Sequence, residues 1–144
     1  YDGNLGGGSG ADAKCMADAN YPGSGTYKAL ITVGTVRSPL GAEWVLQPNT
    51  DYYRSDGVTK IMTTDNNFGI FTFGTLDNSF GSSGQYWTAL FTDWALHDFD
   101  CSAWTNNSNV NNGIGGNAVA TDSSSISTAV ATCDTARSLL CVEQ

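Results

Sequence analysis

The chain of 144 residues is long enough for one domain with a buried hydrophobic core, and we expect a single domain over residues 1–144. Charged residues make up only 14% of it, and the abundance of glycine, serine, threonine and asparagine favours an extracytoplasmic protein, whether at the cell surface, secreted or periplasmic. The net charge of −8 argues against nucleic acid, heparin and anionic lipid as partners. No apolar run approaches the roughly 20 residues of a membrane span, and no signal peptide is visible, so we expect a mature or trimmed chain beginning at Tyr1.

Residues 10–20 (GADAKCMADAN) are predicted to form a short helix near the start of the chain. Ser9 and Asp12 have the S-x-x-D spacing of a helix start, with the acidic side chain near the positive end of the helix. Apolar side chains recur every four residues and predict a narrow buried stripe, made of Ala11, Cys15 and Ala19. Pro22 and its neighbouring glycines end the helix.

Extended segments are predicted to follow. Apolar and polar residues alternate over residues 26–33 (TYKALITV), which indicates a strand. Residues 43–62 indicate shorter extended pieces, with a turn at Pro48-Asn49 and a hairpin turn at residues 55–57 (SDG). Residues 66–76 (NNFGIFTFGTL) are apolar enough to be buried, and residues 138–144 (SLLCVEQ) are expected to form a closing strand.

A long polar stretch, residues 105–127, is rich in asparagine, glycine and serine, and we expect it to be a surface loop inside the domain. It lies between two of the four cysteines, which are Cys15, Cys101, Cys133 and Cys141. Without a C-x-x-C pair and with one histidine, a zinc site is not favoured, and two disulfides are expected. The spacing alone leaves all three possible pairings open.

Several segments resemble the bacterial endostatin-like domains, a family of extracytoplasmic proteins associated with DUF1554. The strongest are GADAKC near the start and the paired C…LLCVEQ at the end, joined by YWTAL and DCSAWTNN; the segment WVLQPNTDYYRSDG matches more loosely. The family is similar to the endostatin domain of collagens XV and XVIII, a variant of the C-type lectin-like fold. The resemblance therefore implies an α+β domain with a short N-terminal helix, mixed or antiparallel strands and long loops.

The same resemblance implies two nested disulfides, Cys15–Cys141 and Cys101–Cys133. The outer bond would join the N-terminal helix to the last strand, and the inner bond would tie together the ends of the polar stretch. On the chain-entropy model they stabilise by roughly 4 to 5 and 3 to 4 kcal/mol as upper values. The basic heparan sulphate patches and early histidines of the vertebrate relatives have no counterpart among the scattered lysines and arginines of this chain.

The sequence offers no constellation that predicts an enzyme. Any catalytic histidine would have to be His97, the only one, which lies in DWALHDFD with Asp93, Asp98 and Asp100 nearby. A histidine among carboxylates can act as a general base or a metal ligand, but an exposed loop histidine is the preferred interpretation. P-loop, HExxH and G-x-S-x-G motifs are absent from the sequence. We predict a non-enzymatic protein without a cofactor.

Calcium-dependent sugar binding is kept as an alternative. C-type lectins that bind calcium use an E-P-N or Q-P-D triplet with a downstream W-N-D, and this chain has Gln47-Pro48-Asn49 without a W-N-D. Residues 106–113 (NNSNVNNG) approach the alternating ligands of a calcium loop but lack its glycine at the sixth position and its closing glutamate.

Aromatic residues crowd the region from residue 86 to residue 104 and supply the candidate binding site. Trp87 and Trp104 are expected in the core, whereas Trp94 and Phe99 lie in an acid-flanked loop and are expected at the surface. Exposed aromatic side chains with a polar rim are typical of protein-binding sites. The candidate protein-binding residues are Trp94, Phe99, His97 and Asp93.

These observations predict a protein-binding domain outside the cytoplasm. The resemblance implies an adhesin of the bacterial surface or a secreted adhesin that contacts host matrix or complement proteins. The alternatives are a structural subunit of a periplasmic, surface or filament-associated assembly, and a calcium-dependent lectin.

Overall fold

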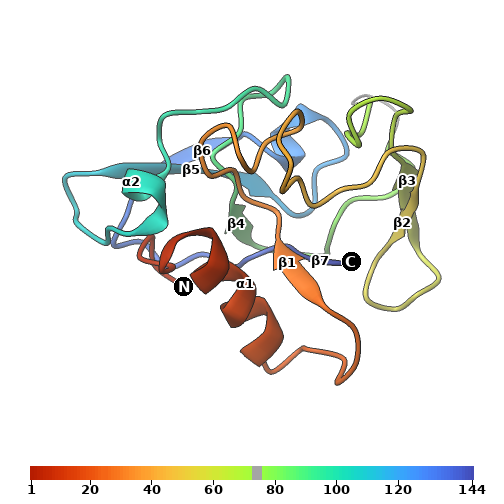
Figure 1. Cartoon of the computed structure of the whole chain (residues 1–144), viewed down its shortest axis with the longest axis horizontal. Helices are drawn as coiled ribbons and strands as arrows, with labels where there is room; N and C mark the ends of the chain where they lie inside the picture. The colour runs from red at the N-terminus through yellow and green to blue at the C-terminus, as the bar shows by residue number, and fades with distance from the viewer. Residues whose placement is uncertain (73–75) are drawn as a thin grey trace.

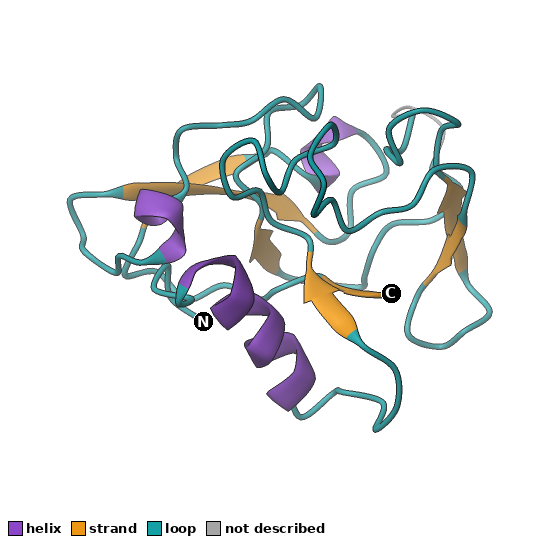
Figure 2. Cartoon of the chain, in the orientation of Figure 1, coloured by secondary structure: helices purple, strands orange, loops and turns teal. Residues whose placement is uncertain are grey.

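The computed structural model describes residues 1–72 and 76–144 and has an α+β architecture with long loops (Figures 1 and 2). In chain order its elements are α1 (Gly7–Ala17), β1 (Tyr27–Ala29), β2 (Asp51–Tyr53), β3 (Lys60–Thr63), β4 (Gln85–Trp87), α2 (Cys101–Trp104), β5 (Asn112–Asn117), the 3-10 turn η1 (Ser123–Ser125), β6 (Ala129–Thr132) and β7 (Cys141–Glu143). The strand pairs are antiparallel: β1 with β7, β2 with β3, and β5 between β4 and β6. None of the helices in the described part is long and apolar enough to cross a membrane.

The predicted N-terminal helix is present, but its predicted start is wrong. It begins at Gly7 after Gly6, whose φ of 83° is left-handed, and no side chain caps it. Ala11 and Cys15 form its buried face as predicted, whereas Ala19 lies beyond the helix and is exposed.

Asp12 joins the helix to the rest of the domain instead of stabilising its N-terminus. Its carboxylate accepts hydrogen bonds from Arg37 at 2.8 and 2.6 Å and from the backbone N–H of Ala29 at 2.9 Å. The Arg37 side chain is nearly fully buried, so this two-bond contact compensates a charge that would otherwise be costly inside the protein. A long-range ion pair of this kind leaves no local pattern in the sequence.

The β1–β7 ribbon brings the two ends of the chain together. Gln144 N–H donates to the carbonyl of Thr26, and Leu30 N–H to that of Leu140, which continues the ladder past both ends of β1. The Cys15–Cys141 disulfide, with a Cα–Cα distance of 5.7 Å, fastens α1 to this ribbon. The closing strand and the outer disulfide are therefore as predicted.

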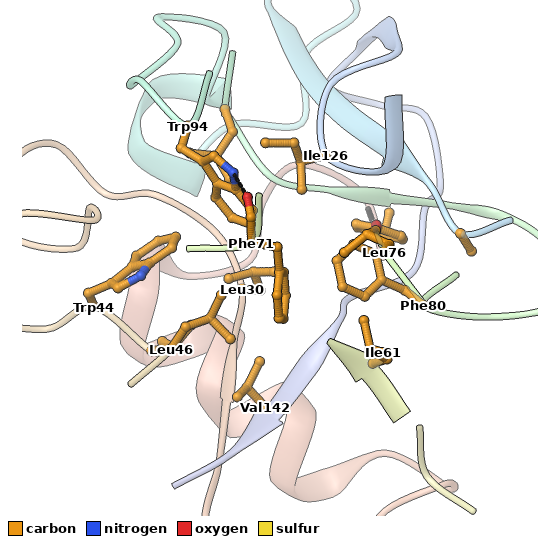
Figure 3. Packing of buried hydrophobic residues seen from close by; sticks show 14 residues of the cluster. Leu30, Trp44, Leu46, Ile61, Phe71, Leu76, Phe80, Trp94, Ile126 and Val142 are labelled. Atoms are coloured by element: carbon orange, nitrogen blue, oxygen red, sulfur yellow. Dashed lines mark hydrogen bonds between the residues drawn. The ribbon is translucent and has the colours of Figure 1, made fainter. Parts of the chain in front are cut away.

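Residues at the end of β1 and directly after it lie between two hydrophobic clusters. Ala29 and Ile31 are buried in one cluster, around Trp87, Trp104 and both disulfides, and Leu30 is buried in the other. The second cluster is rich in aromatic rings and is drawn in Figure 3. The alternation predicted for residues 26–33 is thus real, but the strand itself is only three residues long and both of its faces are covered by protein.

The second cluster also includes part of the predicted buried segment 66–76. Phe71 and Leu76 are both buried, as expected for an apolar stretch. The prediction for residues 73–75 lies outside the described residues.

The β2–β3 hairpin turns where the sequence predicted it. The Asp56 carboxylate accepts hydrogen bonds from the backbone N–H groups of Val58 and Thr59 and from the Thr59 hydroxyl. These bonds favour the charged carboxylate and lower the pKa of Asp56 to about 2. The turn is therefore specified by a local side-chain contact, which explains why it could be predicted.

The prediction that the long polar stretch is a surface loop is wrong for its central part, although the residues before β5 and directly after it do form loops. The stretch contains β5, the central strand of the three-stranded sheet, whose middle four residues are all buried. Glycine is required here because of close approach: a Cβ at Gly113 would lie 2.6 Å from Cζ3 of Trp87 and 2.8 Å from Sγ of Cys101. The glycines that suggested a loop are what let β5 pack under these groups.

Candidate functional site

Trp94, a predicted surface residue, belongs to the core. It is 4% exposed, and its indole N–H donates to the carbonyl of Phe71 at 3.0 Å. Its ring meets that of Trp44 edge to face, with centroids 6.1 Å apart. Figure 3 shows the indole pointing into the cluster, so Trp94 is not available to a partner and its assignment as a binding residue is wrong. Trp87 and Trp104 are fully buried, as predicted.

The other aromatic residues of the same loop form a stack at the surface. The ring of His97 lies between those of Phe91 and Phe99, with centroid distances of 4.1 and 4.7 Å. Phe91 is 46% and Phe99 37% exposed. We call these three residues the aromatic stack. It includes the predicted His97 and Phe99 and adds Phe91, which was not among the predicted site residues.

Local hydrogen bonds position the stack. Residues 90–96 form a tight loop in which Phe91 N–H donates to the Ala95 carbonyl at 2.8 Å. The Asp93 carboxylate accepts from Ala95 N–H at the exposed tip of that loop. His97 and Phe99 lie on either side of a bend at Asp98, which is closed by a hydrogen bond from Phe99 N–H to Nδ1 of His97 at 3.0 Å. The contact between His97 and Phe99 could have been predicted, because the two residues are close in the sequence. The contact between Phe91 and His97 could not, because it depends on closure of the 90–96 loop.

Backbone conformations that L-amino acids disfavour are concentrated around the stack. Of the seven non-glycine residues with positive φ in the described chain, six lie between residues 89 and 104. Ala89 and Trp94, with φ of 55° and 68°, flank Phe91 in the chain, and α2 supplies the other four. Strained backbone of this kind persists where the surrounding structure enforces it, and it clusters at functional sites.

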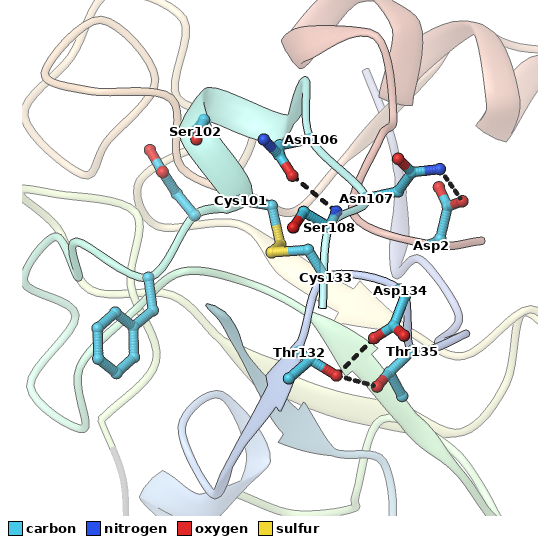
Figure 4. The surroundings of a disulfide bond; sticks show 12 residues. Asp2, Cys101, Ser102, Asn106, Asn107, Ser108, Thr132, Cys133, Asp134 and Thr135 are labelled. Carbon is cyan, nitrogen blue, oxygen red and sulfur yellow. Dashed lines mark hydrogen bonds between the residues drawn. A yellow bond between two sulfur atoms is a disulfide. The ribbon is translucent and has the colours of Figure 1, made fainter. Parts of the chain in front are cut away.

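The four residues of α2 form a left-handed turn that is separated from Phe99 only by Asp100. Its φ values run from 52° to 63°, a conformation that costs roughly 1–2 kcal/mol per residue. The Asp100 side chain caps the turn through Ala103 N–H, and the indole of Trp104 donates to the Thr32 carbonyl at 2.7 Å. The Cys101–Cys133 disulfide, the predicted inner bond, fixes the first residue of the turn to the end of β6 (Figure 4).

Acidic residues neighbour the aromatic stack in the sequence. Asp93 and Asp98 are exposed and Asp100 is half-buried, while the sequence from residue 89 to residue 104 contains no lysine or arginine. The site therefore combines apolar ring surface with negative charge. Such a surface can bind an apolar group next to a cationic one.

The two segments considered for calcium are not part of the aromatic stack. Gln47, Pro48 and Asn49 directly precede β2, and residues 106–113 lead into β5, where Gly113 pairs with Asp100. The Asn106 side chain accepts from Ser108 N–H, and that of Asn107 donates to Asp2 at 3.1 Å, as Figure 4 shows. In the described ranges, no group of three or more histidine, cysteine, aspartate or glutamate side chains is placed to hold a metal ion.

Comparison with known proteins gives one informative result. No curated protein matches the chain. A family model described as "Protein of unknown function (DUF1554)" matches residues 1–121. This range covers α1, the β2–β3 hairpin, the aromatic stack and β5. The chain therefore belongs to the DUF1554 family.

Proposed function

We propose that this chain is a non-enzymatic, extracytoplasmic protein-binding domain whose partner docks on the aromatic stack. The observation that carries the proposal is the coincidence of exposed, mutually stacked rings with the strained backbone of residues 89–104. Energetically costly backbone conformations next to an exposed apolar surface are better explained by recognition than by stability.

The geometry suits a binding hot spot. The exposed parts of Phe91 and Phe99 together would contribute roughly 2 kcal/mol of burial free energy on contact with a partner. The stack and the neighbouring disulfide hold the rings in place before binding, so little side-chain entropy is lost on association. The acidic rim of Asp93 and Asp98 favours a partner surface with basic groups around an apolar centre.

The kind of partner is inferred from the resemblance to endostatin-like domains. The short N-terminal helix, the ribbon that joins both chain ends and the two nested disulfides agree with that resemblance and with a C-type-lectin-like fold. We therefore propose adhesion to host matrix or complement proteins. Two disulfides are typical of proteins that fold in an oxidising compartment, which fits a location outside the cytoplasm.

The test compares two exposed phenylalanine sites. The variant Phe91→Ala/Phe99→Ala removes two rings of the stack, and Phe68→Ala removes a phenylalanine of similar exposure (42%) outside it. Binding is measured against a panel of immobilised matrix proteins and complement regulators. We expect the double variant to weaken binding about thirtyfold, because roughly 2 kcal/mol of contact is lost, and Phe68→Ala to leave it unchanged.

Other outcomes point to the alternative functions. Equal binding by the double variant and wild type would contradict the proposal. Stable self-association of the wild-type chain, disrupted by the same double variant, would favour a structural subunit. Binding that a calcium chelator abolishes would favour a lectin.

A further inference from the structure

A second candidate site is a groove between the β2–β3 hairpin and the β1–β7 ribbon, which lie side by side in Figure 1. Its volume is about 840 Å³, and none of the rings of the aromatic stack lines it. Its floor consists of apolar side chains of the aromatic-rich cluster, several of which are labelled in Figure 3: Leu30, Leu46, Ile61, Phe71 and Val142.

One wall of the groove is the free edge of β7. Gln144 N–H donates to the Thr26 carbonyl and Leu30 N–H to the Leu140 carbonyl. Hydrogen-bonded pairs alternate along an antiparallel ladder, so Val142 forms such a pair with β1, and its N–H and C=O both point toward that strand. The backbone N–H and C=O groups of Cys141 and Glu143 must then point away from β1. Within residues 1–72 and 76–144 these groups have no hydrogen-bond partner.

The facing wall is the free edge of β2. Thr50 accepts from Thr64 and Arg54 donates to Thr59, so these positions face β3. The backbone groups of Asp51 and Tyr53 point to the other side, and no described residue bonds them. Two unpaired strand edges therefore border one groove with an apolar floor.

The groove also has two chemically different faces. Val142 contacts the apolar cluster, whereas Cys141 and Glu143 lie on the opposite side of β7, the side of α1, because side chains alternate along a strand. Glu143 and Asp18, which follows α1, place negative charge on that face. The arginines that line the groove are held by other groups: Arg54 by Ser79, and Arg137 by the Ala129 carbonyl and the Trp87 ring.

We propose that this groove binds an extended segment of a partner polypeptide, which adds as a strand to the free edge of β7. A peptide backbone offers donors and acceptors at the spacing that Cys141 and Glu143 present. In the added strand, alternate side chains would face the apolar floor and the acidic α1 side. The segment recognised is therefore one in which apolar and basic residues alternate. This site is independent of the aromatic stack.

The test uses a defined probe, an acetylated and amidated peptide of alternating valine and lysine about six residues long, the usual length of a strand. Binding is followed by amide resonances of the ¹⁵N-labelled protein. We expect shifts at Cys141 and Glu143. We also expect about tenfold weaker binding when all backbone amides of the probe are methylated, because the donors that would bond to Cys141 and Glu143 are then lost whichever way the added strand runs.

A matched pair of variants tests the edge itself. Glu143→Ala and Glu143→Pro both remove the carboxylate, but only proline removes the outward N–H, and neither removes a bond to β1. We expect the proline variant to bind the probe about tenfold more weakly than the alanine variant. Unchanged resonances of the aromatic stack report that both variants are folded.

Three results would overturn the proposal. They are equal binding by the two variants, shifts confined to residues 89–104, and no shift with the probe at about 1 mM, where even weak complexes form. Because Phe91 and Phe99 take no part in this test, its failure leaves the proposed function of the aromatic stack standing.

Discussion

Trp94 and Phe91 belong to the same tight loop, yet one is buried and the other is half exposed. The hydrogen bond from Trp94 N–H to the Phe91 carbonyl closes the loop, and the positive φ of Trp94 turns its indole toward the core. The acidic residues in DWALHDFD led to the prediction that Trp94 is exposed. They lie at the surface themselves, but the indole of Trp94 faces inward. His97 and Phe99 were predicted at the surface because their spacing and neighbours are local properties.

The burial of Trp94 leads to a stability prediction. Trp94→Phe keeps most of the ring but deprives the Phe71 carbonyl of its donor, which is expected to lower the free energy of unfolding by about 1–3 kcal/mol. Trp94→Ala is expected to cost about 3–5 kcal/mol because a large cavity is left. Urea unfolding measures both. Folded Trp94→Phe should bind partners as wild type does; weaker binding at unchanged stability would mean that Trp94 contacts the partner.

The elements differ in how far the sequence specifies them. The β2–β3 hairpin and the closing strand could be predicted, because the Asp56 turn and the apolar LLCV run are local features. Strand β5 could not, because its glycines have low strand propensity and are needed for close packing against Trp87 and Cys101, which only the fold brings to them. The left-handed turn α2 could not be predicted either, because tertiary contacts enforce it and no local sequence pattern indicates it.

The two disulfides should therefore have different roles. Removing the outer bond with Cys15→Ser/Cys141→Ser is expected to lower the free energy of unfolding by at most about 5 kcal/mol, since it closes a loop of 126 residues. The inner pair, Cys101→Ser/Cys133→Ser, closes 32 residues and is expected to cost at most about 4 kcal/mol. Chemical denaturation under non-reducing conditions measures both losses.

Partner binding should distinguish the inner disulfide from the outer one more clearly than stability does. Of the two disulfides, the inner one is attached to the α2 turn beside Phe99, so its removal is expected to weaken binding by the folded protein about tenfold or more. The outer variant, compared under conditions where it is folded, should bind normally. Loss of binding in the outer variant alone would refute this division.

At the scale of the whole molecule, the β1–β7 ribbon and the two hydrophobic clusters hold together the segments that form two separate candidate binding surfaces (Figure 1). The aromatic stack lies on the loop before α2, and the groove lies between the hairpin and the chain ends. The sequence predicted the α+β class and, through the resemblance, the nested disulfides. It could not predict either surface in full, since each combines segments that only the fold brings together. The net charge of −8 should make association with a basic partner salt-dependent.

The most direct test of the central claim is a hydrogen-exchange footprint of the complex formed with whichever matrix or complement protein binds the wild-type chain. The proposed function predicts that backbone amides between residues 89 and 104 exchange more slowly in the complex than in the free protein, with the largest change around Phe91 and Phe99. Protection confined to other segments, with residues 89–104 exchanging as in the free protein, would contradict the assignment of the aromatic stack as the binding surface.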